Sequence, residues 1–179
     1  MQSDYIPRDC MKLLLTALMP ENRLALEASM ATGLRIDDVL SIRTGKLRQR
    51  MTIREMKTGK AKRVYWPEDI YHRMLRIAGR YFVFEGRCDC RKHRTRQAVF
   101  KDLKRVAKLY RLDGKKIAEN VSPHTARKIY AVEQFHSGKN LWKVKELLNH
   151  SNEAVTMLYA LADDLTAARL KDRALCAGE

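Results

Sequence analysis

The sequence predicts a mainly α-helical domain that carries one small antiparallel β-sheet, an α+β fold. Apolar residues recur at helical spacing through most of the 179 residues, and one segment, residues 46–66, shows the alternation of strands instead. Hydrophobic residues make up 45% of the chain and aromatic residues only 7%, which favours an aliphatic core. A chain of this length is enough for a single domain, 1–179, with a real core.

Three helices are expected in the first 42 residues. An apolar stripe between Pro7 and Pro20 predicts the first. The second should run from Glu21 to Thr32 and end at Gly33, because a glycine commonly follows the last residue of a helix. A third, short helix is indicated by the apolar residues Ile36, Val39, Leu40 and Ile42.

A β-hairpin is the natural interpretation of the next segment. The stretches MTIRE and KRVYW alternate β-branched or aromatic residues with polar ones, and Gly59 lies in the connection KTGKA. Residues 46–48 are a candidate third strand. Helical periodicity returns at Glu68, is clear from Gln97 to Tyr110, and continues in pieces that break near Gly114, Gly138 and Asn149.

The charge of the chain points to a polyanionic partner. Its formal net charge is +15, and such an excess attracts phosphates, although ribosomal, chromatin and membrane-surface proteins share it. No secretory signal and no apolar run of about 18 residues is present, so we expect a cytoplasmic protein without a membrane span. Cys88, Cys90 and His93 lack a fourth ligand and the usual spacing for zinc, and we interpret their segment as a basic loop that holds no metal.

Two segments carry arginines suited to a phosphate. Ser122 and Pro123 predict a helix start, which places His124 and Arg127 on one face of the first turn, beside free backbone amides. The alternative is a capping histidine and a solvated arginine. Arg35 follows a helix stop and is either a surface residue or a second guanidinium for the same phosphate.

Three further residues would complete such a site. Asp38 is a candidate acceptor for Arg35 or His124, or an ordinary surface acid. Lys57 lies at the hairpin tip, where a mobile lysine can donate a proton, and Lys60 competes for that role. Tyr159 follows a helix that Ser151 would cap; most tyrosines in such places only pack, and a hydroxyl with a pKa of about 10 needs nearby arginines to act as a nucleophile.

Together, these segments resemble the catalytic domain of the tyrosine recombinases, the phage-integrase family. The resemblance spans roughly residues 5 to 170, and Asn149 replaces the usual glycine before its second histidine. The matching motifs are Thr32-Gly33-Leu34-Arg35 with Asp38, the turn Lys57 to Lys60, His124-x-x-Arg127, Leu148-Asn149-His150-Ser151, and Tyr159 nine residues after His150.

The resemblance implies a reaction that cuts and rejoins DNA strands with no metal and no cofactor. Tyr159 would attack a phosphate, form a 3′-phosphotyrosyl bond and release a 5′-hydroxyl. Lys57 would protonate the leaving oxygen and His124 would assist proton transfer at the tyrosine. The non-bridging oxygens would be held by Arg35, Arg127 and His150.

The resemblance also implies partners. One is double-stranded DNA at attachment or recombination sites. The others are further copies of the chain, which would form a tetramer in the synapse. The tail, residues 163–179, would dock on a neighbouring copy or pack against its own domain. We expect the N-terminal DNA-clasping domain of the family to be missing from this chain, which would then be either an excised catalytic domain or a minimal recombinase. The expected setting is a bacterial or phage-encoded, nucleoid-associated protein. Further contacts to DNA are predicted for Lys60, Lys62, Arg63, Arg94, Arg96 and Lys128.

Two other classes of function remain open at this stage. A non-catalytic DNA-binding domain of the same fold would need no tyrosine at that spacing. A generic RNA-binding module fits poorly with so few aromatic residues and no RNA-recognition signature. Type IB topoisomerases share the chemistry, but the hairpin and the His-x-x-Arg motif resemble integrases more.

Overall fold

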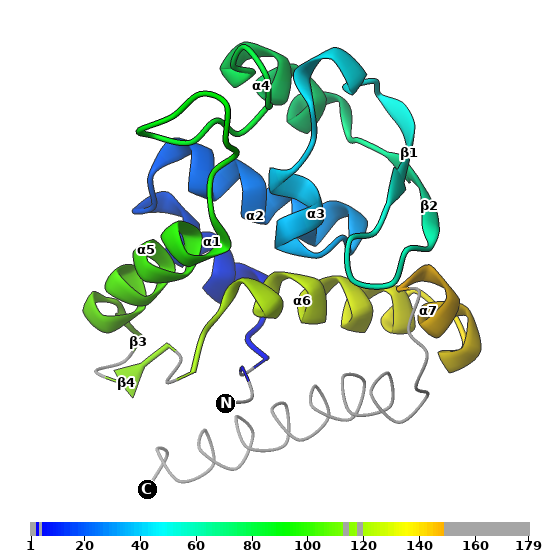
Figure 1. The fold of residues 1–179 in the computed structure, drawn as a ribbon. Helices are drawn as coiled ribbons and strands as arrows, with labels where there is room; N and C mark the ends of the chain where they lie inside the picture. The colour runs from blue at the N-terminus through cyan, green and yellow to red at the C-terminus, as the bar shows by residue number, and fades with distance from the viewer. Residues whose placement is uncertain (1–2, 4, 113–114, 118–119, 149–179) are drawn as a thin grey trace, which may run out of the picture.

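Helices form most of the molecule, as the sequence predicted (Figure 1). The computed structural model describes residues 3, 5–112, 115–117 and 120–148. Within them the helices are α1 Arg8–Thr16, α2 Pro20–Thr32, α3 Ile36–Leu40, α4 Glu68–Ile77, α5 Arg96–Leu109, α6 Pro123–His136 and α7 Leu141–Leu147. The strands are β1 Arg50–Arg54, β2 Ala61–Tyr65, β3 Arg111–Leu112 and β4 Lys115–Lys116.

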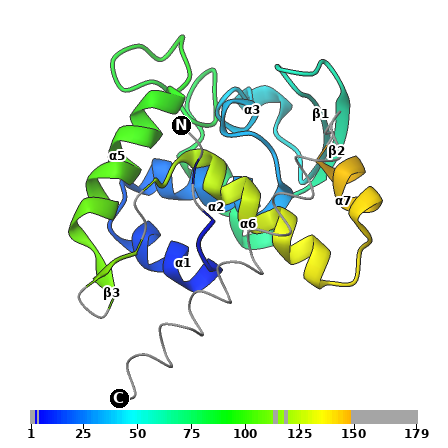
Figure 2. The same cartoon turned by 90° about the horizontal axis from the view of Figure 1, so that it is seen from below.

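Helix α2 is the centre of the fold. It packs against α3, α4, α5 and α6, and residues on nearly all of its sides are buried, among them Leu24, Leu26 and Met30. In the view from below, α6 crosses it while α5 and the hairpin β1–β2 lie on opposite sides (Figure 2). The core around α2 is largely aliphatic, with Trp66 as its largest side chain. None of the described helices is long and apolar enough to cross a bilayer.

Strands β1 and β2 form the predicted antiparallel hairpin. Ile53 pairs with Lys62 and Met51 with Val64, so all four of these side chains lie on one face of the hairpin, which is turned toward the core. The candidate third strand at residues 46–48 is not formed. Instead, Thr44–Lys46 form a 3-10 helix, which follows directly on the β-bridge between Arg43 and Phe82. The structure adds the short pair β3–β4, which was not predicted.

Gly33 ends α2 in the left-handed conformation, with a φ of 66°, as expected for a residue after a helix. The position has a second constraint, because a Cβ built there would overlap the side-chain ring of Tyr130 on α6. Gly59 in the hairpin turn has the same φ of 66°, but a Cβ there would meet nothing within 4 Å. Gly59 is therefore required only for its backbone conformation, whereas Gly33 is required for its backbone conformation and for the close packing of Tyr130.

We expect Gly33→Ala to lower the free energy of unfolding by about 2 to 4 kcal/mol, because it combines a left-handed alanine with overpacking against Tyr130. Gly59→Ala should lower it by only about 1 kcal/mol, the conformational part alone. Urea unfolding of both variants measures the difference. Equal losses would show that Tyr130 moves aside without penalty.

Candidate active site

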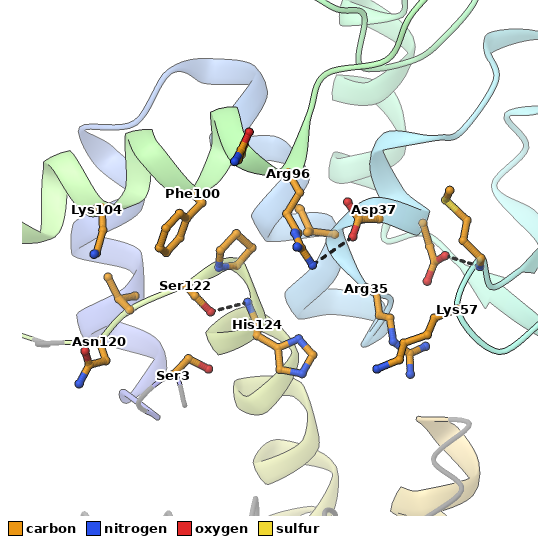
Figure 3. A pocket seen from close by; sticks show the side chains of 16 residues that line it. Ser3, Arg35, Asp37, Lys57, Arg96, Phe100, Lys104, Asn120, Ser122 and His124 are labelled. Atoms are coloured by element: carbon orange, nitrogen blue, oxygen red, sulfur yellow. Dashed lines mark hydrogen bonds and ion pairs between the residues drawn. The ribbon is translucent and has the colours of Figure 1, made fainter. Parts of the chain in front are cut away.

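Three segments that are far apart in the sequence meet at one pocket of about 660 Å³. Arg35 comes from the connection between α2 and α3, Lys57 from the turn between β1 and β2, and His124 from the first turn of α6. In Figure 3 the His124 ring is directed toward the side where Arg35 and Lys57 lie. Helix α5 contributes Phe100 and Lys104 on the side away from Lys57, whereas its first residue, Arg96, reaches toward Asp37 beside Arg35.

The start of α6 fixes His124 in place. As predicted, Ser122 is the N-cap and Pro123 the first helical residue; the Ser122 hydroxyl accepts a hydrogen bond from His124 N at 3.1 Å. In return, Thr125 Oγ1 accepts from Ser122 N at 3.2 Å, which completes a capping box. The histidine therefore stands on a rigid helix end, where backbone amides and the helix dipole favour an anion.

His124 is expected to be neutral in the free protein. Desolvation lowers the pKa of His124 to about 4 even though the residue as a whole is solvent-exposed, and four neighbouring cations contribute in the same direction: Arg127, Arg35, Lys128 and Lys57. A neutral imidazole accepts a proton from a partner. The site therefore supplies a proton acceptor beside a concentration of positive charge.

Arg35 connects the pocket to the protein interior. It is the N-cap residue of α3, its side chain is 16% exposed, and its Nη1 donates to Glu55 Oε2 at 2.6 Å. A guanidinium has five N–H donors, so this bond leaves others that can serve an anion in the pocket. The predicted pairing of Arg35 with a phosphate is compatible with this geometry.

Arg127 lies behind the pocket, with a side chain that is 1% exposed. It donates to Gly33 O at 2.7 Å and to Leu148 O, and its Nη1 lies 3.8 Å from Glu55 Oε1. It is not among the pocket-lining residues. In this structure it joins the Arg35 loop to the end of α7.

Asp38 holds the hairpin. It is buried, and the bond that its Oδ1 accepts comes from Met56 N at 2.8 Å, on the turn that carries Lys57. The sequence predicts Arg35 or His124 as the partner of Asp38, and neither is the donor in this bond. Burial raises the pKa of Asp38, and the nearby charge of Glu55 adds to this against the opposing effects of the Met56 amide and the arginines. Its supporting role therefore remains a prediction, now directed at the hairpin.

The competition between Lys57 and Lys60 has a geometric answer. Both lysines are exposed, but Lys57 lines the pocket and Lys60 does not. Lys57 is therefore the better placed of the two for a proton transfer in the pocket.

The residues predicted to contact DNA fall into two groups. Arg96 lines the pocket and forms an ion pair with Asp37 at 3.6 Å; Lys60 and Arg63 are exposed. The other three are largely buried and bonded within the protein, which argues against direct DNA contacts: Lys62 donates to Thr32 O at 2.8 Å, Arg94 lies 3.2 Å from Glu21, and Lys128 donates to Ser3 O at 2.6 Å.

Comparisons with known proteins identify the family of the chain. A model of the phage integrase family matches residues 5–165. The chain belongs to the phage integrase family. A tyrosine recombinase from Thermosipho africanus is 28% identical over 167 residues, which cover 87% of this integrase-family chain and 56% of that protein. The chain spans about half the length of the curated relatives it matches.

Solved integrase structures share the fold of this family member. The catalytic domain of bacteriophage HP1 integrase is 18% identical, with a TM-score of 0.61, over 90% of this chain and 89% of that one. A lambda integrase dimer bound to a COC′ core site is 15% identical, with a TM-score of 0.71, over 89% of this chain and 60% of that one. At this identity the likeness shows the fold, so the predicted fold class is confirmed.

Several predictions lie outside the described residues of this integrase-family chain. They concern His150, Tyr159, the helix after Ser151 and the tail 163–179. Among the residues that the structure does describe, no three His, Cys, Asp or Glu side chains are grouped so that they could hold a metal ion, and Cys88 and Cys90 are exposed.

Glu55 is a site residue that the sequence motifs do not include, although it contacts both arginines of the site. A usable signal was present. Glu55 continues the alternation that buries Ile53, so it falls on the core face of the hairpin, where a carboxylate needs a cationic partner.

Proposed function

We propose that this chain is the catalytic domain of a site-specific DNA recombinase or integrase that cuts and rejoins strands through a 3′-phosphotyrosyl intermediate. The observation that carries the proposal is the pocket where Arg35, Lys57 and His124 meet, because it combines an anion-binding guanidinium, a proton donor and a proton acceptor. The net charge of +15 suits a DNA substrate.

In the proposed reaction, the Tyr159 oxygen attacks a DNA phosphate and its proton passes to the neutral imidazole of His124. The bond from phosphorus to the 5′-bridging oxygen breaks, and Lys57 gives that oxygen a proton. Negative charge grows on the non-bridging oxygens in the transition state, where fixed cations stabilise it more than they stabilise the bound substrate. We assign this role to Arg35, Arg127 and His150.

The substrate and the assembly follow from the same proposal. A lambda integrase of this fold forms a dimer on a core-site DNA. For this chain we propose double-stranded attachment or recombination sites in the bacterial cytoplasm, bound by several copies and by four in the synapse. Tail residues 163–179 would dock on a neighbouring copy.

Covalent trapping tests the proposal. The protein is incubated with labelled, nicked duplexes that cover random sequence and the DNA flanking its gene, and the reaction is quenched in SDS. We expect a slower-migrating protein–DNA band that survives EDTA and is lost in Tyr159→Phe. A control incubation with protease should remove the band.

A persistent lack of this band would contradict the proposal, provided that the protein binds the same duplexes and the true recombination site is included. The domain would then be a DNA-binding module that keeps the fold without the reaction. A band that persists in Tyr159→Phe would show that another residue is the nucleophile.

A further inference from the structure

Glu55 is a buried carboxylate that contacts both arginines of the candidate site. Its Oε2 accepts hydrogen bonds from Arg35 Nη1 at 2.6 Å and from Thr58 Oγ1 at 2.8 Å. Its Oε1 faces Arg127 Nη1 at 3.8 Å. The side chain is 0% exposed, so these partners replace the water that the carboxylate loses on folding.

The charge of Glu55 is maintained by these partners. Burial by itself would raise the pKa of Glu55, but the bonds from Thr58 and Arg35 and the charges of Arg35 and Arg127 outweigh it, and the pKa is lower than usual. Two other charged groups act on the same cluster, Lys62 and Asp38. Glu55 is therefore an anion at neutral pH, held between two arginines.

The same residue closes the turn that presents Lys57. Its backbone N donates to Lys60 O at 2.9 Å, and its carbonyl oxygen accepts from Gly59 N at 2.8 Å. Thr58, which bonds the Glu55 carboxylate, directly follows Lys57 in the sequence. Backbone and side chain of Glu55 thus fix both sides of Lys57.

Glu55 lies behind Arg35 as seen from the pocket. Arg35 lines the pocket and is partly exposed, whereas Glu55 is fully buried and does not line it. If Glu55 occupied the phosphate position itself, its carboxylate would line the pocket and be open to solvent, and it does neither. Its position suits a support for Arg35, whose other N–H donors can serve an anion in the pocket.

We propose that Glu55 is a positioning residue for DNA strand cleavage, which holds Arg35 from behind, pairs with the buried Arg127 and ties both arginines to the turn that carries Lys57. The proposal rests on the proposed function, because it concerns the rate of the same reaction. It predicts that loss of the carboxylate affects the arginines and the lysine together, whereas loss of the Thr58 hydroxyl affects mainly the lysine.

The test compares rates of covalent complex formation at saturating DNA, on a duplex that the wild type cleaves. Glu55→Gln keeps the shape and removes the charge, and Thr58→Val removes the bond between the carboxylate and the turn. We expect Glu55→Gln to be about 10- to 100-fold slower and Thr58→Val about 3- to 10-fold slower, with DNA affinity changed less than about threefold.

A second substrate separates the two effects. Replacing the 5′-bridging oxygen of the scissile phosphate with sulfur gives a leaving thiolate, whose conjugate acid has a pKa of about 8.5, so it leaves without a proton from Lys57. On this substrate Thr58→Val should approach the wild-type rate. Glu55→Gln should stay at least about fivefold slower, because its arginines remain misplaced.

Asp102→Asn is the matched control. Asp102 is also a largely buried carboxylate, bonded to Arg105 Nη2 at 2.7 Å and to Asn22 Nδ2 at 2.8 Å, but it does not line the pocket. Its loss should lower stability and leave the cleavage rate of the folded protein within about twofold of wild type.

The outcomes distinguish this inference from the proposed function. A wild type that forms no covalent complex on its true site would overturn both. An active wild type with Glu55→Gln cleaving equally fast would overturn the inference alone. If Glu55→Gln does not fold, Thr58→Val decides: an unchanged rate, or an equal loss on the oxygen and sulfur substrates, would also overturn it.

Discussion

Replacing Arg35 with alanine is expected to slow formation of the covalent protein–DNA complex by about 10²- to 10³-fold. Arg35 is partly exposed at the pocket and is fixed from behind by Glu55, so it meets an anion without first having to be ordered. Losing one fixed donor to a developing oxyanion typically has an effect of this size. The rate of complex formation at saturating DNA measures it.

Stability must be separated from chemistry in this experiment, because alanine at position 35 also deprives the buried Glu55 of a cation. Arg35→Lys restores a charge but not the planar pair of donors, so it should recover stability more than rate. Arg73→Ala is the control, since Arg73 pairs with Glu27 and Asp69 and does not line the pocket. Equal slowing in Arg73→Ala and Arg35→Ala would contradict a role of Arg35 in the reaction.

The helix ends were predictable because local chemistry sets them. Gly33 takes a backbone conformation that other residues adopt with difficulty, and Ser122 with Pro123 satisfies and shapes the start of a helix whatever packs around it. The hairpin was predictable for a similar reason, since alternation and a glycine turn are encoded within about 20 residues.

Features that depend on distant contacts were not predictable in the same way. Residues 46–48 were a candidate third strand, but Thr44–Lys46 form a 3-10 helix next to the bridge that Arg43 makes with the distant Phe82. The pair β3–β4 does have a local signal in the sequence, at the point where Gly114 interrupts the helical pattern. An Asp-Gly dipeptide joins its two strands in the sequence, and this dipeptide favours a tight hairpin turn.

The site shows the same limit. Its motif residues could be identified one by one, and the structure brings Arg35, Lys57 and His124 to one pocket. Which basic residues face solvent depends on the packing of other elements, and composition does not reveal it. Lys62 and Lys128 were predicted to contact DNA, yet both are bonded to backbone carbonyls in the interior.

Lys62 should make the stability of this protein rise with pH above neutrality. Burial, helped by the charges of Arg127 and Arg35, lowers its pKa from 10.5 to about 7, although Glu55 and Asp38 act in the opposite direction. Between these two pH values the unfolded chain binds a proton that the folded chain does not. Folding is therefore increasingly favoured as pH rises from about 7 to 10.5, by up to about 1.4 kcal/mol per pH unit.

Below pH 7 the lysine is charged in both states, and its contribution no longer changes with pH. Lys62→Met removes this titration and keeps the length of a side chain that lies 5.5 Å from the Tyr130 ring. The difference in unfolding free energy between wild type and Lys62→Met should therefore shift in favour of the wild type by about 1 kcal/mol per unit between pH 7.5 and 9.5. Urea unfolding at several pH values measures this difference. Lys60→Met is the control, because Lys60 lies in the same hairpin but is exposed. Parallel pH profiles for wild type and Lys62→Met would contradict this prediction. They would mean that Lys62 stays charged in the folded protein, with its ammonium group bonded to Thr32 O.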